Sequence, residues 1–200
     1  MEKYVITLSR QFASMGRTIA QEASRCLGIE FYDRDIVEAT ARRMGQSVPE
    51  ISRVEESVGS GFGRRRYPLG IGLVSMQEEV FEVQSNIIRD LAAKESCIIV
   101  GRCADYLLKD MPRVLNVYIF APEEARLRNC VEKLGMEEKT ARKLLREVDR
   151  ARETYRLRYC DGVKSVLDHR DLLIDSSRFG PKDTAKLLCG MVREVFGEER

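Results

Sequence analysis

The sequence of 200 residues contains no tryptophan, one histidine and five prolines, and none of its apolar runs approaches the length of a membrane span. The chain does not open with a basic region followed by an apolar stretch, so we expect no signal peptide. The single histidine, His169, lies in a polar segment, where we expect it to be solvated rather than catalytic. Together these absences predict a cytoplasmic protein without a membrane partner.

The six cysteines form no C-x-x-C pair and are scattered along the chain, at Cys26, Cys97, Cys103, Cys130, Cys160 and Cys189. This spacing supports neither a zinc site nor a disulfide framework. We therefore expect free thiols in a reducing compartment.

The charge is nearly balanced, with 34 basic and 32 acidic residues and a formal net charge of +2. Because no known nucleic-acid-binding motif is present and the net charge is close to zero, we expect no nucleic-acid partner. A hydrophobic content of 44% in a chain of this length suits one domain, or one domain with a mobile insert.

Residues 4–28 carry the strongest local signal in the chain. Residues 4–8 predict a short buried strand, 9–15 a small polar loop, and 16–27 a helix that stops at Gly28. A strand, a loop and a helix start in this order form an anion site. Unpaired backbone N–H groups and the positive end of the helix dipole both face the loop.

Residues 11–18 partly fit the phosphate-binding pattern G-x-x-x-x-G-K-[ST]. Gly16 keeps the second glycine, Thr18 keeps the hydroxyl that faces Mg²⁺, and Arg17 keeps a cation in place of the lysine. Gln11 stands where the first glycine belongs. Arginine binds phosphate through a planar fork, so this exchange preserves the charge and changes the geometry. By itself, the degenerate motif also suits an α/β turn without a ligand.

Short apolar strands alternate with helices along the whole chain. The expected strands are 4–8, 29–32, 96–100, 114–120 and 171–175. The expected helices are 16–27, 36–44, 73–94, 104–109, 121–134, 137–156 and 181–196. Ser47 and Glu50 predict the capping box of one more short helix. This alternation predicts a doubly wound α/β fold with a five-stranded parallel sheet, in which ligands lie beyond the carboxyl ends of the strands.

Several charged segments allow more than one interpretation. The glycine-rich segment 57–72, which contains Arg64, is either a solvated surface loop or a mobile anion-binding flap. The arginines of helix 137–156 alternate with acids, so the helix is an ion-paired solvated face, a nucleic-acid-binding helix or a lid over phosphates. The phosphate-binding pattern upstream favours the lid. Asp33 and Asp35 follow the second strand either as helix caps or as ligand-binding acids.

The segments that carry the closest likeness to known proteins are ITLSRQFASMGRTIA, LGIEFYDRDIV, IIVGRCADYLL, DRARETYRLRY and LLIDSSRFG. In this order, over nearly the whole chain, the sequence resembles the cytidylate kinase-like family of P-loop nucleoside monophosphate kinases. The resemblance implies a three-layer P-loop NTPase fold with a monophosphate-binding insert and a helical lid. The implied single kinase domain divides into a core of 1–45, 95–135 and 160–200, an acceptor-binding insert of about 46–94 and a lid of about 136–159.

The resemblance also implies ATP and Mg²⁺ as cofactors and assigns residues to them. The residues implied to hold the ATP phosphates are Gln11, Phe12, Ala13, Ser14, Met15, Gly16, Arg17 and Thr18, with Thr18 also on Mg²⁺. The implied substrate-binding residues are Asp33, Arg64, Arg102 and Arg156. The arginines implied in catalysis are Arg17, Arg102, Arg150 and Arg152. Arg158 is a further lid arginine.

The third strand departs from the family pattern. Ordinary cytidylate kinases carry acids on both sides of the glycine-arginine pair there, whereas this chain has Val100 and Cys103, with Asp105 two residues farther on. The implied function is ATP-dependent phosphoryl transfer to a nucleoside monophosphate, CMP or dCMP. A catalytically impaired nucleotide-binding regulatory module and a P-loop kinase of another small metabolite stay open. The expected partners are small-molecule nucleotides, and the chain is either a monomer or a homodimer.

Overall fold

The structure, a computed structural model, describes residues 2–56 and 71–197 and contains a five-stranded parallel sheet. The strands lie in the order β2-β3-β1-β4-β5. Their bounds are Val5–Arg10 (β1), Glu30–Tyr32 (β2), Cys97–Val100 (β3), Val114–Phe120 (β4) and Leu172–Asp175 (β5). Val5 at the start of β1 lies opposite Cys97 on one side and Val114 on the other. The α/β class and the five parallel strands predicted from the sequence are confirmed.

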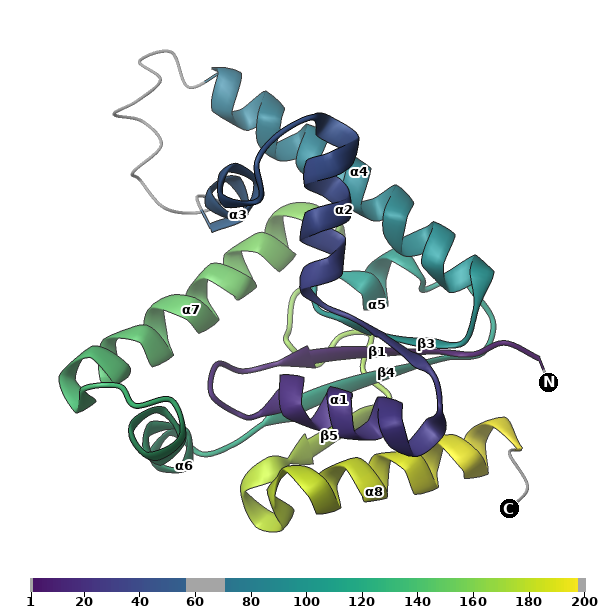
Figure 1. The fold of residues 1–200 in the computed structure, drawn as a ribbon, viewed down its shortest axis with the longest axis vertical. Helices are drawn as coiled ribbons and strands as arrows, with labels where there is room; N and C mark the ends of the chain where they lie inside the picture. Colours follow the sequence, from purple (N-terminus) through teal and green to yellow (C-terminus); the bar gives the residue numbers. More distant parts are fainter. Residues whose placement is uncertain (1, 57–70, 198–200) are drawn as a thin grey trace.

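Helices cover both faces of the sheet (Figure 1). The helices on one face are α1 (Gly16–Leu27) and α8 (Ser176–Phe196), and those on the other are α2 (Arg34–Met44), α4 (Ile71–Lys94) and α5 (Ala104–Leu107). Side chains alternate along β1, so Ile6 and Leu8 pack with α1 and α8, whereas Val5 packs with α2, α4 and α5. The two apolar faces of one sheet therefore hold three layers together.

The helix α3 (Val48–Glu56) joins α2 and α4 in a smaller cluster beside the main core. Ile51 and Val54 of α3 pack there with Val80 of α4. The predicted capping box at the start of α3 is present: the Ser47 N–H donates to the Glu50 carboxylate at 3.0 Å, and the Glu50 N–H donates to Ser47 Oγ at 3.4 Å. This cluster brings Glu55 of α3 to Arg102, beyond the carboxyl end of β3.

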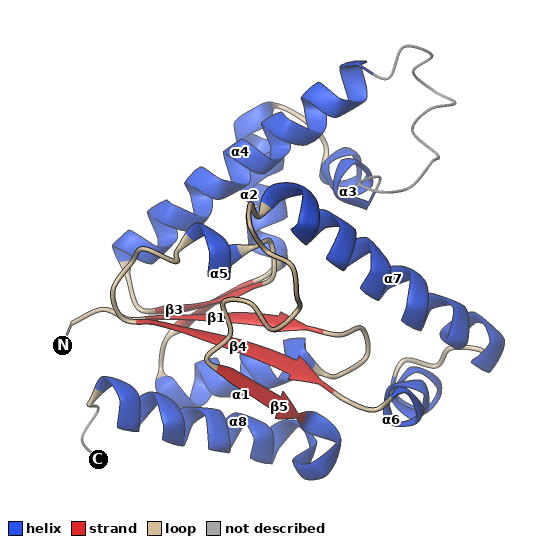
Figure 2. Ribbon diagram, turned by 180° about the vertical axis from the view of Figure 1, so that it is seen from behind, coloured by secondary structure: helices blue, strands red, loops and turns tan. Residues whose placement is uncertain are grey.

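The helix α7 (Glu138–Tyr159) crosses the carboxyl ends of the strands, on the opposite side of the sheet from the two chain ends (Figure 2). It follows α6 (Glu123–Arg128) and a π-helical turn, η2 (Asn129–Lys133). Leu145 of α7 packs with Leu127 of α6, and Phe12 of the β1–α1 loop lies against the same cluster. The helix expected over 121–134 thus changes from α to π in its last turn.

The helix α8 starts five residues before the predicted position 181. The Asp175 side chain accepts the Ser177 N–H at 2.9 Å and begins a helical turn, and Gly180 (φ 72°) then bends the chain before Pro181 continues the helix. Among residues 2–56 and 71–197, no helix is long and apolar enough to cross a membrane.

Candidate functional site

The loop between β1 and α1 is held in shape by buried hydroxyl groups. Ser14 Oγ donates to the Gln11 carbonyl at 2.9 Å, and Ser176 Oγ donates to the Ser14 carbonyl at 2.7 Å. Ala13 (φ 58°) and Met15 (φ 62°) adopt the left-handed region on either side of Ser14. The loop therefore leads directly into the first turn of α1, where the backbone N–H groups have no helical acceptor and attract anions.

Gln11 uses its side chain to join the loop to the end of β4. Its amide oxygen accepts the Ala121 N–H at 3.1 Å, and its own N–H donates to the Ile119 carbonyl at 3.0 Å. A glycine at this position has no side chain for the first of these bonds. The departure from the phosphate-binding pattern thus supplies a contact that the pattern lacks.

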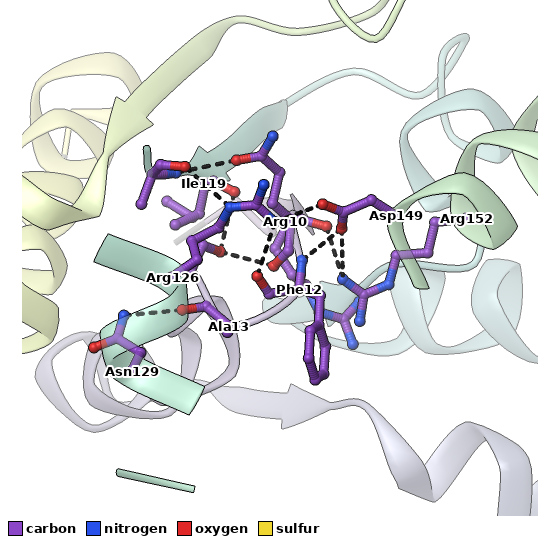
Figure 3. A network of polar contacts seen from close by, with 11 residues as sticks. Arg10, Phe12, Ala13, Ile119, Arg126, Asn129, Asp149 and Arg152 are labelled. Atoms are coloured by element: carbon purple, nitrogen blue, oxygen red, sulfur yellow. Dashed lines mark hydrogen bonds and ion pairs between the residues drawn. The ribbon is translucent and has the colours of Figure 1, made fainter. Parts of the chain in front are cut away.

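An ion pair from α6 and α7 clamps the loop at Phe12 (Figure 3). The Asp149 carboxylate accepts the Phe12 N–H at 2.7 Å and pairs with Arg126 at 2.6 Å. Arg126 in turn donates to the carbonyl groups of Phe12 at 3.2 Å and Ala121 at 3.1 Å. Asn129 donates to the Ala13 carbonyl at 2.9 Å. Both backbone groups of Phe12 are therefore fixed by one pair of charged side chains.

Asp33 lies buried at the carboxyl end of β2 and faces the loop. Its carboxylate pairs with Arg17 Nε at 3.2 Å and with Arg10 Nη2 at 3.5 Å. The sequence allowed Asp33 to be either a helix cap or a ligand-binding acid. Its side chain makes no capping hydrogen bond to α2. The acid instead lies between the loop and the neighbouring strand end.

Arg102, at the carboxyl end of β3, pairs with Glu55 of α3. Glu55 also accepts a hydrogen bond from Gln84 of α4, and Gln84 accepts one from the Tyr155 hydroxyl of α7 at 3.4 Å. Thus α3 supplies a carboxylate beside the glycine-arginine pair, where Val100 and Cys103 supply none.

Arg10, the last residue of β1, was not among the predicted site residues, yet it lies at the centre of the site. The pKa of Arg10 falls from its ordinary value to about 9, chiefly through burial and then through the like charge of Arg152, with smaller contributions from Arg102 and Arg17. Asp33 opposes this shift. Arg152 of α7 donates to the Arg10 carbonyl at 3.0 Å, and burial lowers the pKa of Arg152 as well.

Four arginines (Arg10, Arg17, Arg102 and Arg152) therefore lie around Asp33, with Glu55 beside Arg102 and Asp149 beside Arg152. Positive charges brought together out of water are stabilised by a bound anion. The predicted residues Arg17, Asp33, Arg102 and Arg152 meet at this place because each follows a strand end or lies on the helix that crosses those ends.

Two other predicted arginines have different surroundings. Arg156 is buried and pairs with Asp105 at 2.6 Å, and Arg170 pairs with the same carboxylate oxygen at 2.8 Å. Arg156 thus has a buried acid of the chain itself as its partner, and the ion pairs of Asp105 are with Arg156 and Arg170, not with Arg102. Arg150 is exposed, and Arg64 lies outside the described residues.

Arg158, the further lid arginine, donates to the Gln77 side chain of α4 at 2.7 Å. Its contact is with α4 and not with the β1–α1 loop.

The residues present fit a phosphate chain better than they fit a dedicated metal cage. The largely buried Arg10 and Arg152 beside Asp33 match a polyanion, and the half-buried Thr18 on the first turn of α1 would offer its hydroxyl to Mg²⁺. In the part of the chain that the structure describes, no group of three or more histidine, cysteine, aspartate or glutamate side chains suits a metal ion. Mg²⁺ would therefore depend on the phosphates for most of its ligands.

The comparisons with known proteins agree with this arrangement. Residues 5–178 match the family model of the cytidylate kinase-like family. A similar solved structure is an uncharacterized protein from Eubacterium ventriosum, with a TM-score of 0.72 and 21% identity over 95% of this chain and 98% of that chain. A shikimate kinase from Bacteroides thetaiotaomicron is similar with a TM-score of 0.56 and 12% identity, over 97% of this chain and 98% of its own.

A gluconokinase from Sinorhizobium meliloti is similar with a TM-score of 0.51 and 11% identity, over 98% of each chain. At these identities the structures show a shared fold. None of the curated proteins matches this sequence.

Proposed function

The chain belongs to the cytidylate kinase-like family, and from this premise we propose that it transfers the γ-phosphoryl group of ATP to a small phosphorylated acceptor, with CMP and dCMP as the first candidates. The observation that carries the proposal is the convergence of four arginines on Asp33, between the loop and the ends of β2 and β3. This concentration of positive charge, in which Arg10 and Arg152 are largely removed from water, suits the phosphates of two nucleotides that meet head to head.

In this proposal the loop and the start of α1 bind the donor phosphates, and Arg102 orients the acceptor phosphate. Arg152 and the rest of α7 (within the proposed lid, 136–159) cover the reacting groups and exclude water. Mg²⁺, held with Thr18, would offset the charge of the phosphates. A phosphate oxygen is already ionised at neutral pH, so the acceptor needs no general base.

We assign acceptor recognition to the proposed insert, 46–94. It contains α3 and α4, which bring Glu55 and Gln84 to Arg102. A cation beside a carboxylate and an amide suits an acceptor with one anionic end and several hydrogen-bonding groups, as a nucleotide has. The remainder, 1–45, 95–135 and 160–200, forms the core in this division.

A kinase of another small metabolite is the second candidate, since structures similar to this chain include kinases named for shikimate and for gluconate. A hydroxyl acceptor needs a free base to take its proton. Asp33, the acid at the carboxyl end of β2, is already engaged by Arg10 and Arg17, and Asp149 is engaged by the Phe12 N–H and Arg126. This engagement favours a phosphate acceptor.

The test is ADP release from ATP and Mg²⁺ with CMP, dCMP, UMP, AMP, GMP, shikimate, gluconate or no acceptor. We expect CMP or dCMP to stimulate release, and Arg102→Ala to raise the KM for the acceptor at least tenfold with little change in the KM for ATP. Stimulation by shikimate or gluconate alone would establish the metabolite kinase. If the chain binds ATP but no acceptor stimulates ADP release, the remaining interpretation is a nucleotide-binding regulatory module.

A further inference from the structure

Two glycines of the site, Gly16 and Gly101, lie directly against Arg10. A Cβ atom at Gly16 would lie 2.7 Å from Arg10 Cβ, and one at Gly101 would lie 2.6 Å from Arg10 Nη1. Both separations are shorter than Cβ contacts in real proteins. The stem of Arg10 therefore fills the space above Gly16, and its guanidinium fills the space at Gly101. The absence of side chains at both positions makes room for this one arginine.

Arg17, which the phosphate-binding pattern places at the lysine position, has the opposite environment. Its side chain is 57% exposed, whereas that of Arg10 is 20% exposed. Arg17 already pairs with Asp33 at 3.2 Å, and the contact of Arg10 with the same acid is longer, at 3.5 Å. Arg10 has lost most of its water and is surrounded mainly by like charge. It is thus the cation that gains most from a bound anion.

The backbone supports a shift of the pattern by one residue. If the pattern is moved so that its first glycine position falls at Arg10, its second glycine position falls at Met15. Met15 has a positive φ of 62°, which glycine adopts without strain. The lysine position then falls at Gly16, which has no side chain, and Arg10 occupies the space that a side chain there would need. Thr18 falls one residue beyond the hydroxyl position, still on the first turn of α1.

We propose that Arg10, and not Arg17, is the cation with which the loop binds the phosphate chain of ATP. The inference rests on the proposed function and names the residue for its donor site. The guanidinium of Arg10 lies between the loop and the corner at Gly101, next to Arg102. From there a planar fork reaches phosphate oxygens of the donor on one side and of the acceptor on the other.

The test compares Arg10→Ala, Arg10→Lys, Arg17→Ala and Arg25→Ala in the whole chain. Arg25 pairs with Glu22 on the surface of α1 and serves as the control. ADP binding is measured by calorimetry, and turnover is measured with ATP and the best acceptor of the panel. We expect Arg10→Ala to weaken ADP binding at least tenfold and to lower kcat about a hundredfold. Arg17→Ala should weaken binding about threefold, and Arg25→Ala should leave it unchanged.

Arg10→Lys, which keeps the charge and loses the fork, should restore part of the ADP affinity and less of kcat. A merely structural role would give equal recovery of both. Because Arg10→Ala risks unfolding, Arg10→Met provides a second perturbation, which keeps a stem against Gly16, removes the guanidinium and should reproduce the loss of affinity with the melting temperature nearly unchanged. An Arg17→Ala variant that loses more ADP affinity than Arg10→Ala would overturn the inference.

The same measurements separate this inference from the kinase proposal. If the wild-type chain binds ADP but no acceptor stimulates turnover, the kinase proposal fails, and the ADP affinities of the variants still decide the role of Arg10. If the wild-type chain binds neither ADP nor ATP, both fail.

Discussion

The pair Asp149–Arg126 allows a quantitative prediction for the replacement Asp149→Ala. The replacement removes the acceptor of the Phe12 N–H and leaves the guanidinium of Arg126, whose side chain is only 9% exposed, without its counter-ion. Breaking a buried pair by removal of one partner costs about 3–5 kcal/mol. Asp149 is 26% exposed and Arg126 keeps two carbonyl acceptors, so we take a lower value of about 2–3 kcal/mol. For a chain of this length that loss lowers the melting temperature by about 4–12 °C.

The assay is urea unfolding and thermal melting of Asp149→Ala beside Glu147→Ala. Glu147 lies on the same helix, and its pair with Lys143 is exposed and 3.7 Å long, so its removal should cost less than about 0.5 kcal/mol. Asp149→Asn keeps an acceptor for the Phe12 N–H and should fall between the two. If Asp149→Ala is as stable as Glu147→Ala, the ion pair does not hold the loop and the reasoning from burial is wrong.

Three further predictions concern other charged groups. Asp105→Ala leaves the buried side chains of Arg156 and Arg170 without their acid and should lower the free energy of unfolding in urea by about 3–5 kcal/mol. The control Asp110→Ala, at an exposed position, should lower it by less than about 0.5 kcal/mol, and equal urea midpoints for the two variants would contradict the prediction. Affinity for ADP, measured by calorimetry from pH 7 to 10.5, should fall by about tenfold per pH unit above pH 9, because free Arg10, with a pKa of about 9, loses its proton there and must regain it to bind the anion; a flat profile would exclude Arg10 as the cation. Asp175→Ala removes the N-cap of α8 and should lower the free energy of unfolding by about 1 kcal/mol. A urea midpoint equal to that of the wild-type chain would refute this prediction.

Most of the fold was predictable from the sequence because parallel strands covered on both faces are short apolar runs. All five strands were found this way, and the errors lie at their ends. Predicted strand 4–8 continues to Arg10, which is polar, and α8 begins at Ser176 because the Asp175 side chain caps a turn before Pro181. Local patterns show apolar runs, but they do not show where a polar residue continues a strand.

The site was predictable only in part. Because ligands of parallel sheets lie beyond the strand ends, the sequence predicted that Arg17, Asp33 and Arg102 lie close together, as they do in the structure. The contacts of Glu55 and Asp149 join residues 47 and 137 positions apart in the sequence, and no local pattern carries such pairings. Arg10 was missed because the phosphate-binding pattern was laid one residue downstream of it. The two glycines that make room for Arg10 were the available signal.

The helix α7 is attached at its middle and at its last turns, and this has a consequence for the energetics of binding. Asp149 and Arg152 tie its middle to the β1–α1 loop, while Tyr155 and Arg158 tie its last turns to Gln84 and Gln77 of α4. In the proposed kinase, a displacement of α4 on acceptor binding would be transmitted through α7 to the β1–α1 loop. Donor and acceptor would then share a coupling free energy, and each would change the affinity for the other by the same factor.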